Sequence, residues 1–302
     1  MLKLKPTTLK QREAIWGYLL IGPWIIGFII FTAGPMIASL VLSFTHYNIL
    51  EPPTFIGLSN FIKLFTSDPK FWHSLGVTLT FAVVAIPLNL VFGFMVAYLL
   101  NLKVPGVSFW RTGYYLPSVM PGVATALLWG LIFNPRFGIL NWLIGLVGIK
   151  GPGWLSSPDW ALRALILMSL WGVGGGMIIY LAGLQGIPTT IYEASQIDGA
   201  NKLQQLFFIT IPLMSPVIFY NLVTGIIGTF QYFTDAYVLT GGGPVDATLF
   251  YNLYVYKHAF TYLNMGYASA LAWVLFIIVL IFTLLVFKSS EFWVFYEGEL
   301  HR

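Results

Sequence analysis

Residues 268–287 read ASALAWVLFIIVLIFTLLVF, a run of twenty residues without a single charge. A helix of about 20 predominantly apolar residues is long enough to cross the hydrocarbon core of a bilayer. Similar runs recur along the chain, and backbone polar groups in lipid must be satisfied within each segment. The sequence therefore predicts an all-α integral membrane protein with about six transmembrane helices. These spans cover residues 15–44, 75–100, 110–133, 160–184, 206–237 and 268–287.

The composition agrees with this class. Hydrophobic residues make up 58% of the 302 residues and charged residues 9%, which is outside the range of soluble domains. The formal charge of +4 predicts no nucleic-acid partner, because the basic residues are scattered at the predicted membrane edges. We divide the chain into an N-terminal segment (1–14), a transmembrane permease domain (15–288) and a C-terminal tail (289–302).

The distribution of basic residues predicts the orientation in the membrane. The first span follows Lys3, Lys5, Lys10 and Arg12, as the apolar part of a signal peptide would. Its apolar run is too long for a signal peptide and no small-residue cleavage site follows, so we expect it to stay uncleaved. With six spans and both termini in the cytoplasm, nine of the 15 Lys and Arg residues fall inside and six outside. This excess has the sign of the positive-inside rule.

One polar segment, EASQIDGANK at residues 193–202, lies between two predicted spans on the cytoplasmic side. A chain this apolar does not need an acidic, glycine-broken segment merely to turn around. The residues alone leave two interpretations open for the region 188–205. It is either a docking surface for a partner in water or a solvated loop with ordinary helix caps.

The local sequence predicts two short helices in this region. Pro188 cannot continue the preceding span, because it lacks an amide hydrogen. Thr190 and Glu193 have the spacing of a capping box, which predicts a helix start near Ile191. Gly199 can adopt the left-handed conformation that ends a helix, so a second helix can follow it.

The segment resembles the EAA signature of bacterial ABC importer permeases. The chain departs from the signature at Ser195, where alanine is usual, and at Leu206, where an aromatic residue is common. The resemblance to carbohydrate-type permeases extends over nearly the whole chain, and it implies that part of the segment couples to an ATPase. The strings that carry the resemblance are Glu193-Ala194-Ser195, Ile197-Asp198-Gly199-Ala200, Ile211-Pro212-Leu213 and Ser215-Pro216. The coupling residues that it implies are Glu193, Ala194, Ser195, Asp198, Gly199 and Ala200.

The same resemblance implies a fold, partners and a location. The fold is that of type I ABC importer permeases, with a cytoplasmic coupling helix. The implied partners are a second homologous permease, two cytoplasmic ATPase subunits and an extracytoplasmic binding protein that delivers a sugar or polyol. The location is the bacterial or archaeal cell membrane, with both termini in the cytoplasm.

Five polar or small residues recur in the fifth span at steps of three and four. This spacing keeps all five on one face of a continuous helix, and such a face should not contact lipid. Two interpretations stay open: a path that hydrogen-bonds the solute, or a polar seam packed on another helix with Gly228 allowing close approach. Tyr232, Gln185 and Asn89 are weaker candidates for the path. The five residues are Asn221, Thr224, Gly228, Gln231 and Asp235.

Signals for catalysis, cofactors and metals are missing. The run Gly174–Gly176 lacks the Gly-Lys-Ser/Thr of a phosphate loop, and we interpret Gly172 and Gly176 as a small-xxx-small helix contact. His46, His73, His258 and His301 lack metal-ligand spacing, and the chain contains no cysteine. We therefore expect a transport subunit without a cofactor or metal, with ATP hydrolysis on separate subunits.

The alternative is a secondary carrier or channel that works alone. Carriers commonly contain two repeated halves, and this sequence shows no internal repeat. An importer must also change conformation, and prolines in two spans predict hinges. These are Pro23 and Pro35 in the first span and Pro212 and Pro216 in the fifth.

Overall fold

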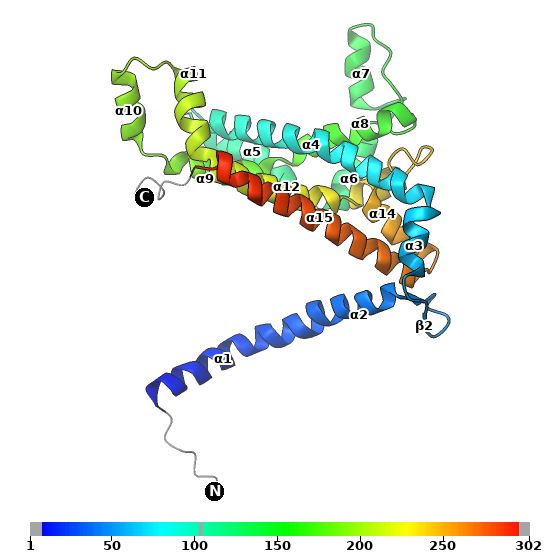
Figure 1. Cartoon of the computed structure of the whole chain (residues 1–302). Helices are drawn as coiled ribbons and strands as arrows, with labels where there is room; N and C mark the ends of the chain where they lie inside the picture. Colours follow the sequence, from blue (N-terminus) through cyan, green and yellow to red (C-terminus); the bar gives the residue numbers. More distant parts are fainter. Residues whose placement is uncertain (1–7, 103–104, 296–302) are drawn as a thin grey trace. The chain divides into compact units, whose positions relative to one another are not determined.

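The computed structural model describes residues 8–102 and 105–295. The chain divides into two compact units (Figure 1). Unit 1 comprises Met1–Thr66 and His258–Trp273, and unit 2 comprises Ser67–Lys257 and Val274–Arg302. Nearly all regular structure in the described residues is helical, which confirms the predicted all-α fold class.

Unit 1 starts with a long apolar helical rod that contains the first predicted span. No residue of its first helix is buried, and a helix that is apolar all round requires lipid or protein around it. A small antiparallel sheet follows, with Thr45 opposite Phe55. The buried Asn60 amide donates to the carbonyls of Ser43 (2.8 Å) and Thr45 (2.9 Å), which fixes α3 to the end of the rod. The elements are α1 (Leu9–Phe28), η1 (Ile29–Ala33), α2 (Gly34–Ser43), β1 (Thr45–His46), β2 (Thr54–Phe55) and α3 (Ser59–Thr66).

Two π-helical turns precede prolines that the sequence singles out as hinges. η1 ends two residues before Pro35, and η3 (Leu206–Thr210) ends two residues before Pro212. Proline cannot donate to the carbonyl four residues earlier and its ring clashes with that turn. A wider π turn accommodates the clash, and such turns are known places where helices bend.

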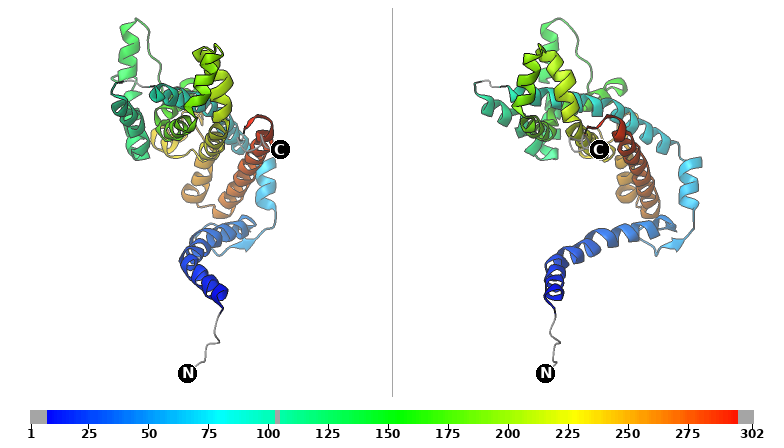
Figure 2. Two further views of the ribbon diagram at one scale, coloured as in Figure 1. Left: turned by 90° about the vertical axis from the view of Figure 1, so that its left-hand side faces the viewer. Right: turned by 60° about the vertical axis from the view of Figure 1, so that its left-hand side comes forward.

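The core of unit 2 forms where three helices pack against one another (Figure 2). These are α4 (Pro69–Asn101), α9 (Gly174–Gly186) and α12 (Ile211–Phe230). Their buried apolar side chains are Val96, Ala97, Leu100, Met177, Tyr180, Leu181, Leu184 and Met214. The part of α15 (Met265–Trp293) that belongs to unit 2 packs along α12, where the rings of Phe219 and Phe287 lie 5.0 Å apart.

Within residues 8–102 and 105–295, four helical stretches are long and apolar enough to cross a membrane, and there are six if two bent pairs each count as one span. α5 (Val107–Val119) and α6 (Gly122–Ile132) meet at 104°, with Pro121 as the N-cap of α6. The stretch formed by α8 (Pro158–Ser169) and η2 (Leu170–Gly172) meets α9 at 44°. The third and fourth predicted spans are therefore not straight helices.

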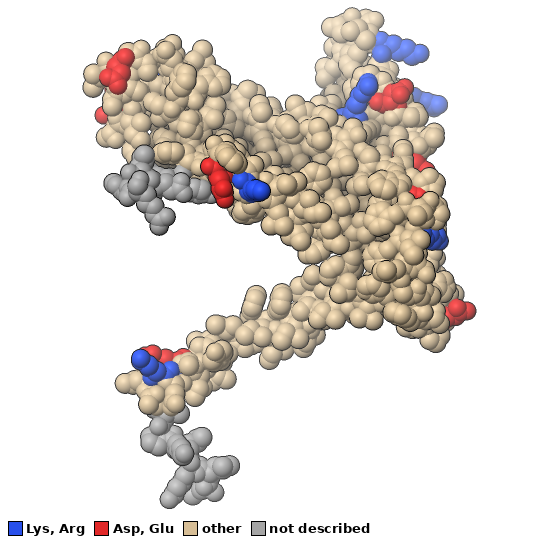
Figure 3. Space-filling model, viewed as in Figure 1, with Lys and Arg blue, Asp and Glu red and all other residues tan. Residues whose placement is uncertain are grey.

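The shorter elements of unit 2 connect these helices along the sequence, and α7 (Ile139–Leu146), α10 (Thr189–Ile197) and α11 (Lys202–Gln205) project from the bundle (Figure 1). In the view of Figure 3, charged side chains of unit 2 gather toward its two ends and leave an uncharged surface between them. This distribution matches a bilayer core around the middle of the unit. The remaining elements are α13 (Thr234–Leu239), α14 (Tyr251–Tyr256) and η4 (Lys257–Thr261), the last of which runs into unit 1.

Candidate functional site

The region 188–205 forms two short helices, α10 and α11, at one end of unit 2 (Figure 1). Pro188 is the N-cap of α10, and no side chain caps this helix. The predicted capping box between Thr190 and Glu193 is therefore wrong. Because α10 starts two residues before Ile191, Thr190 already lies inside the first turn and cannot act as its cap.

The turn that ends α10 is the one that the sequence predicts. Gly199 has φ +83°, the left-handed conformation. The Ala200 amide donates to the Ser195 carbonyl (2.9 Å) and the Gly199 amide to the Gln196 carbonyl (3.1 Å). These two bonds define a Schellman motif, which satisfies the last carbonyl groups of the helix.

A capping box occurs eleven residues later than predicted, at the start of α11. The Asn201 side chain accepts from the Gln204 amide (2.9 Å), and the Gln204 side chain accepts from the Asn201 amide (2.7 Å). Asparagine is a strong N-cap and glutamine three residues later completes the box. The signal was therefore present in the sequence, directly after the left-handed glycine.

α10 has one outer and one inner face. The tip residue Ile197 is 87% exposed. The inner face carries Ser195, whose hydroxyl donates to the Tyr192 carbonyl (2.8 Å). Of the six residues that the resemblance assigns to coupling, Glu193, Ala194, Asp198 and Gly199 are exposed, whereas Ser195 and Ala200 are partly buried.

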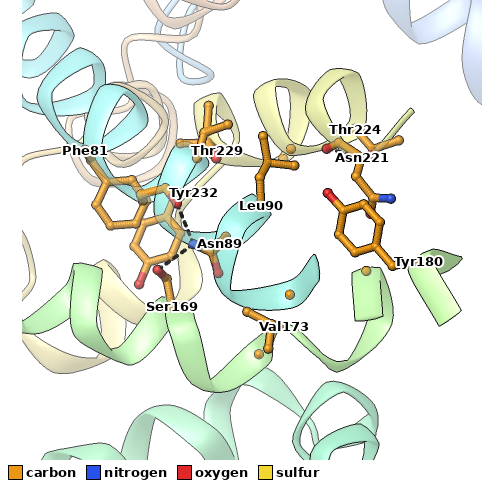
Figure 4. Close-up of a pocket in the computed structure, with 17 residues that line it drawn as sticks. Phe81, Asn89, Leu90, Ser169, Val173, Tyr180, Asn221, Thr224, Thr229 and Tyr232 are labelled. Carbon is orange, nitrogen blue, oxygen red and sulfur yellow. Dashed lines mark hydrogen bonds between the residues drawn. The ribbon is translucent and has the colours of Figure 1, made fainter. Parts of the chain in front are cut away.

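A cavity of about 340 Å³ opens among the helices of unit 2 (Figure 4). The amide of Asn89 on α4 donates to the Ser169 hydroxyl (3.0 Å) on one side of it. Tyr180 on α9 is buried, and its hydroxyl has no hydrogen-bond partner among the described residues. Polar lining residues are Asn89, Ser169, Tyr180, Asn221, Thr224, Thr229 and Tyr232.

The cavity collects three of the five residues of the polar stripe. Asn221, Thr224 and Gly228 line it, whereas Gln231 and Asp235 do not. The continuous helix face that the spacing predicts is interrupted, because α12 ends at Phe230. Gln231 is its C-cap and Asp235 lies in the first turn of the separate helix α13. Asp235 therefore does not share the continuous helix face that the spacing predicts, whereas Gln231 still belongs to the end of α12.

The stripe on α12 partly lines the cavity and partly packs against a neighbouring helix, so the path interpretation and the seam interpretation each describe some of its residues. Asn221 lies where α12 meets α9, since a Cβ on Gly176 would come within 2.9 Å of its side-chain oxygen. Gly228, by contrast, has no atom within 4 Å of where a Cβ would stand. It does not mediate close helix packing as the seam interpretation predicts, and it faces the cavity.

Some lining residues were missed by sequence reasoning. Asn89 and Tyr232 were weaker candidates and do line the cavity, whereas Gln185 does not. Ser169, Tyr180 and Thr229 had not been identified. A lone tyrosine, serine or threonine in an apolar helix carries no spacing signal, so only the packing of α4, α9 and α12 brings these hydroxyl groups together.

Of the two glycines in the small-xxx-small prediction, Gly176 of α9 lies close to Asn221 of α12, whereas Gly172 of η2 makes no close contact. The closest backbone approach is at Gly174, where an added Cβ would collide with the carbonyl oxygen of Tyr114 in α5. Gly172 meets nothing within 4 Å and, like Gly176, lines the cavity. Gly174 therefore allows the contact of α9 with α5 and Gly176 the contact with Asn221 of α12, whereas Gly172 leaves open space beside the cavity.

An ion pair joins the first turn of α4 to the segment between α13 and α14. Lys70 Nζ and Asp246 Oδ2 are 2.8 Å apart, and a ring nitrogen of His73 lies 2.9 Å from the Asp246 carbonyl oxygen. The hydrogen bond from Lys70 lowers the pKa of the Asp246 carboxyl. The pair joins the first turn of α4 to a segment 176 residues later.

No group of three or more His, Cys, Asp or Glu side chains that could hold a metal ion occurs in residues 8–102 and 105–295. His46 lies in β1, His73 in the first turns of α4 and His258 in η4. His301 lies outside the described residues.

Known proteins similar to this chain are membrane permeases, as the helical fold and the apolar composition indicate. The chain is 46% identical over 293 residues to a probable ABC transporter permease protein, YesP, of Bacillus subtilis, covering 96% of this chain and 94% of the relative. It is 34% identical over 290 residues to the trehalose/maltose transport system permease protein MalF of Thermococcus litoralis, covering 94% and 96%.

The fold is also that of a solved structure, a bacterial ABC transporter involved in the import of the acidic polysaccharide alginate. The TM-score is 0.83 at 24% identity, over 93% of this chain and 96% of that one. Residues 89–290, which contain α10 and most of the residues that line the cavity, match the family model described as binding-protein-dependent transport system inner membrane component. The chain therefore belongs to the family of inner membrane components of binding-protein-dependent transport systems.

Proposed function

We propose that this permease subunit imports a sugar or a related polyol, driven by ATP that separate subunits hydrolyse. The observation that carries the proposal is a hydroxyl- and amide-lined cavity inside an apolar bundle of this family. A relative that matches over almost its full length is named as a trehalose/maltose transport permease. The complex would contain a second homologous permease, two ATPase subunits and an extracytoplasmic binding protein.

The cavity is proposed as part of the solute path. Sugar hydroxyl groups both donate and accept hydrogen bonds, and the cavity offers amides at Asn89 and Asn221 and a hydroxyl at Thr224. The Tyr180 hydroxyl supports the proposal most directly. A buried polar group without a protein partner costs free energy unless water or a ligand satisfies it.

α10 is proposed as the helix that docks onto an ATPase subunit, with both chain termini on the same, cytoplasmic side. Its exposed face combines the carboxylates of Glu193 and Asp198 with the exposed apolar side chain of Ile197. A large apolar side chain this exposed at a helix tip, rimmed by polar groups, is typical of an interaction surface.

Uptake into proteoliposomes distinguishes this function from a carrier or channel that works alone. In this test the complex of this chain with its partner permease, ATPases and binding protein is reconstituted. We expect it to accumulate labelled trehalose or maltose only when ATP is present on the side of the membrane that carries the ATPase subunits. The isolated chain should not transport either sugar. Uptake by the isolated chain without ATP would contradict the proposal and favour the carrier.

A second test addresses the path. Asn221→Ala and Thr224→Val should change the apparent affinity or preference for the sugar while basal ATP hydrolysis survives. A loss of detergent stability with an unchanged solute profile would instead assign these residues to helix packing.

A further inference from the structure

α10 is held to the rest of unit 2 by few side chains. None of its residues is buried, and only Ile191, Tyr192 and Ser195 are even partly covered. These three positions lie on one helical face. The chain on either side of α10 turns at once, at Pro188 and at the left-handed Gly199. Apart from the two chain connections, this inner face is the route by which movement of α10 can reach a spanning helix.

The inner face is tied to the π-helical turn at the base of α12 by a directed hydrogen bond. Thr210 Oγ1 donates to the Gln205 carbonyl (3.1 Å), which uses its only proton. The Tyr192 hydroxyl lies 3.0 Å from Thr210 Oγ1. Because the Thr210 proton is used by Gln205, we assign Tyr192 as the donor of this bond. Thr210 is 1% exposed, so this bond is protected from water.

A second set of bonds runs in the opposite direction. The Gln205 side-chain amide donates to Ser195 Oγ (2.9 Å) and, more weakly, to the Tyr192 carbonyl (3.4 Å). Its side-chain oxygen accepts from Lys202 Nζ (3.3 Å). Gln205 is only 3% exposed, so losing these partners would leave a buried amide unpaired. Ser195 is also where the chain departs from the alanine usual in the EAA signature, and alanine could not accept this bond.

We propose that Tyr192, Thr210, Gln205 and Ser195 form a brace that transfers the displacement of α10 to α12. The brace ends at η3, the wide turn before Pro212, where a helix bends most easily. When these hydrogen bonds are formed (the brace is closed), α10 and η3 move as one body. When they are broken (the brace is open), the turns at Pro188 and Gly199 absorb the movement of α10. These are positioning residues, and the transport role of the brace rests on the proposed function.

Tyr192→Phe and Thr210→Val each remove one hydroxyl while keeping the size of the side chain. Loss of one such hydrogen bond should raise the equilibrium constant for opening of the brace by about 2- to 10-fold. In the assembled complex we expect hydrogen exchange of the α10 amides to accelerate by this factor. Tyr18→Phe, the same change at an exposed position of α1, is the control and should leave exchange unchanged. Unchanged exchange in both brace variants would overturn the brace, whatever the complex transports.

The second readout is the number of ATP molecules hydrolysed per sugar imported. This ratio should rise in Tyr192→Phe and in Thr210→Val, which also removes the bond from Thr210 to the Gln205 carbonyl. The double variant should be no worse than Thr210→Val alone, because the bond between Tyr192 and Thr210 is already lost in that variant. A simple folding defect would lower the amount of complex and leave the ratio unchanged. Faster exchange with a wild-type ratio, or additive effects in the double variant, would overturn the coupling role. Wild-type uptake without any need for ATP would instead overturn the proposed function.

Discussion

At the scale of single residues, the coupling segment shows which local signals are decisive. Gly199 is the most constrained position, because its φ of +83° is a conformation that β-branched residues avoid. Glu193, by contrast, is not constrained by the structure around it. It is exposed and does not cap α10, so its carboxylate is available for a partner.

Gly199→Val should disturb the end of α10 while leaving the spans inserted. Space does not limit the substitution, since no atom lies within 4 Å of the added Cβ. The strain of a left-handed valine, about 1–3 kcal/mol, should instead unwind the Schellman turn. We expect lower co-purification of the ATPase and lower uptake. Gly199→Asn is the control, because asparagine tolerates this conformation, and equal ATPase binding by the Val and Asn variants would refute the expectation.

Glu193→Gln tests whether the carboxylate contacts the ATPase. Removing one member of a hydrogen-bonded charge pair in an interface costs about 2 to 5 kcal/mol. Because the structure excludes a capping role, loss of stimulation by sugar-loaded binding protein would have to come from the interface. Glu13→Gln, at an exposed position of α1, is the control. If Glu193→Gln retains wild-type stimulation of ATP hydrolysis, the interface role moves to Asp198.

At the scale of elements, hydrophobic runs predict where helices occur, and capping and turn residues predict some of the helix ends. The spans and the turn at Gly199 follow from length and from glycine chemistry alone. The polar stripe shows the limit. A spacing of three and four residues has meaning only while the helix continues, and α12 ends at Phe230 without a proline or glycine to mark the break. The hydroxyl groups of Ser169 and Tyr180 join Asn221 only through the packing of three helices, which no local pattern encodes.

Gly228→Leu should block the solute path without unfolding the bundle. The site has open space on the cavity side of α12, because no atom outside its own helix backbone lies within 4 Å of an added Cβ. Gly76→Leu is the control, because Gly76 also has open space in a helix but does not line the cavity. We expect uptake to fall in the Gly228 variant only, with similar thermal stability for both. Normal sugar uptake by Gly228→Leu would exclude the cavity from the path.

At the scale of the whole molecule, long-range polar contacts in unit 2 connect segments that the spans separate. The Lys70–Asp246 pair is one of them, and its side chains are 56% and 36% exposed. An ion pair this exposed contributes about 0–1 kcal/mol, since water and salt screen it. Asp246 has φ +58°, so asparagine, which tolerates that conformation, is the substitution that removes the charge with least strain.

The pH dependence of unfolding tests this pair. The hydrogen bond from Lys70 lowers the pKa of Asp246 in the folded state. Its contribution to stability is therefore fully present above the unfolded-state pKa, about 3.9, and is lost as the pH falls through the lower folded-state pKa. Asp246→Asn should unfold at a slightly lower temperature than the wild type at pH 7, and the difference should shrink below about pH 4 and in high salt. Equal unfolding temperatures at pH 7 in low salt would show that screening cancels the pair, and the backbone contact of His73 would then be the tie between α4 and this segment.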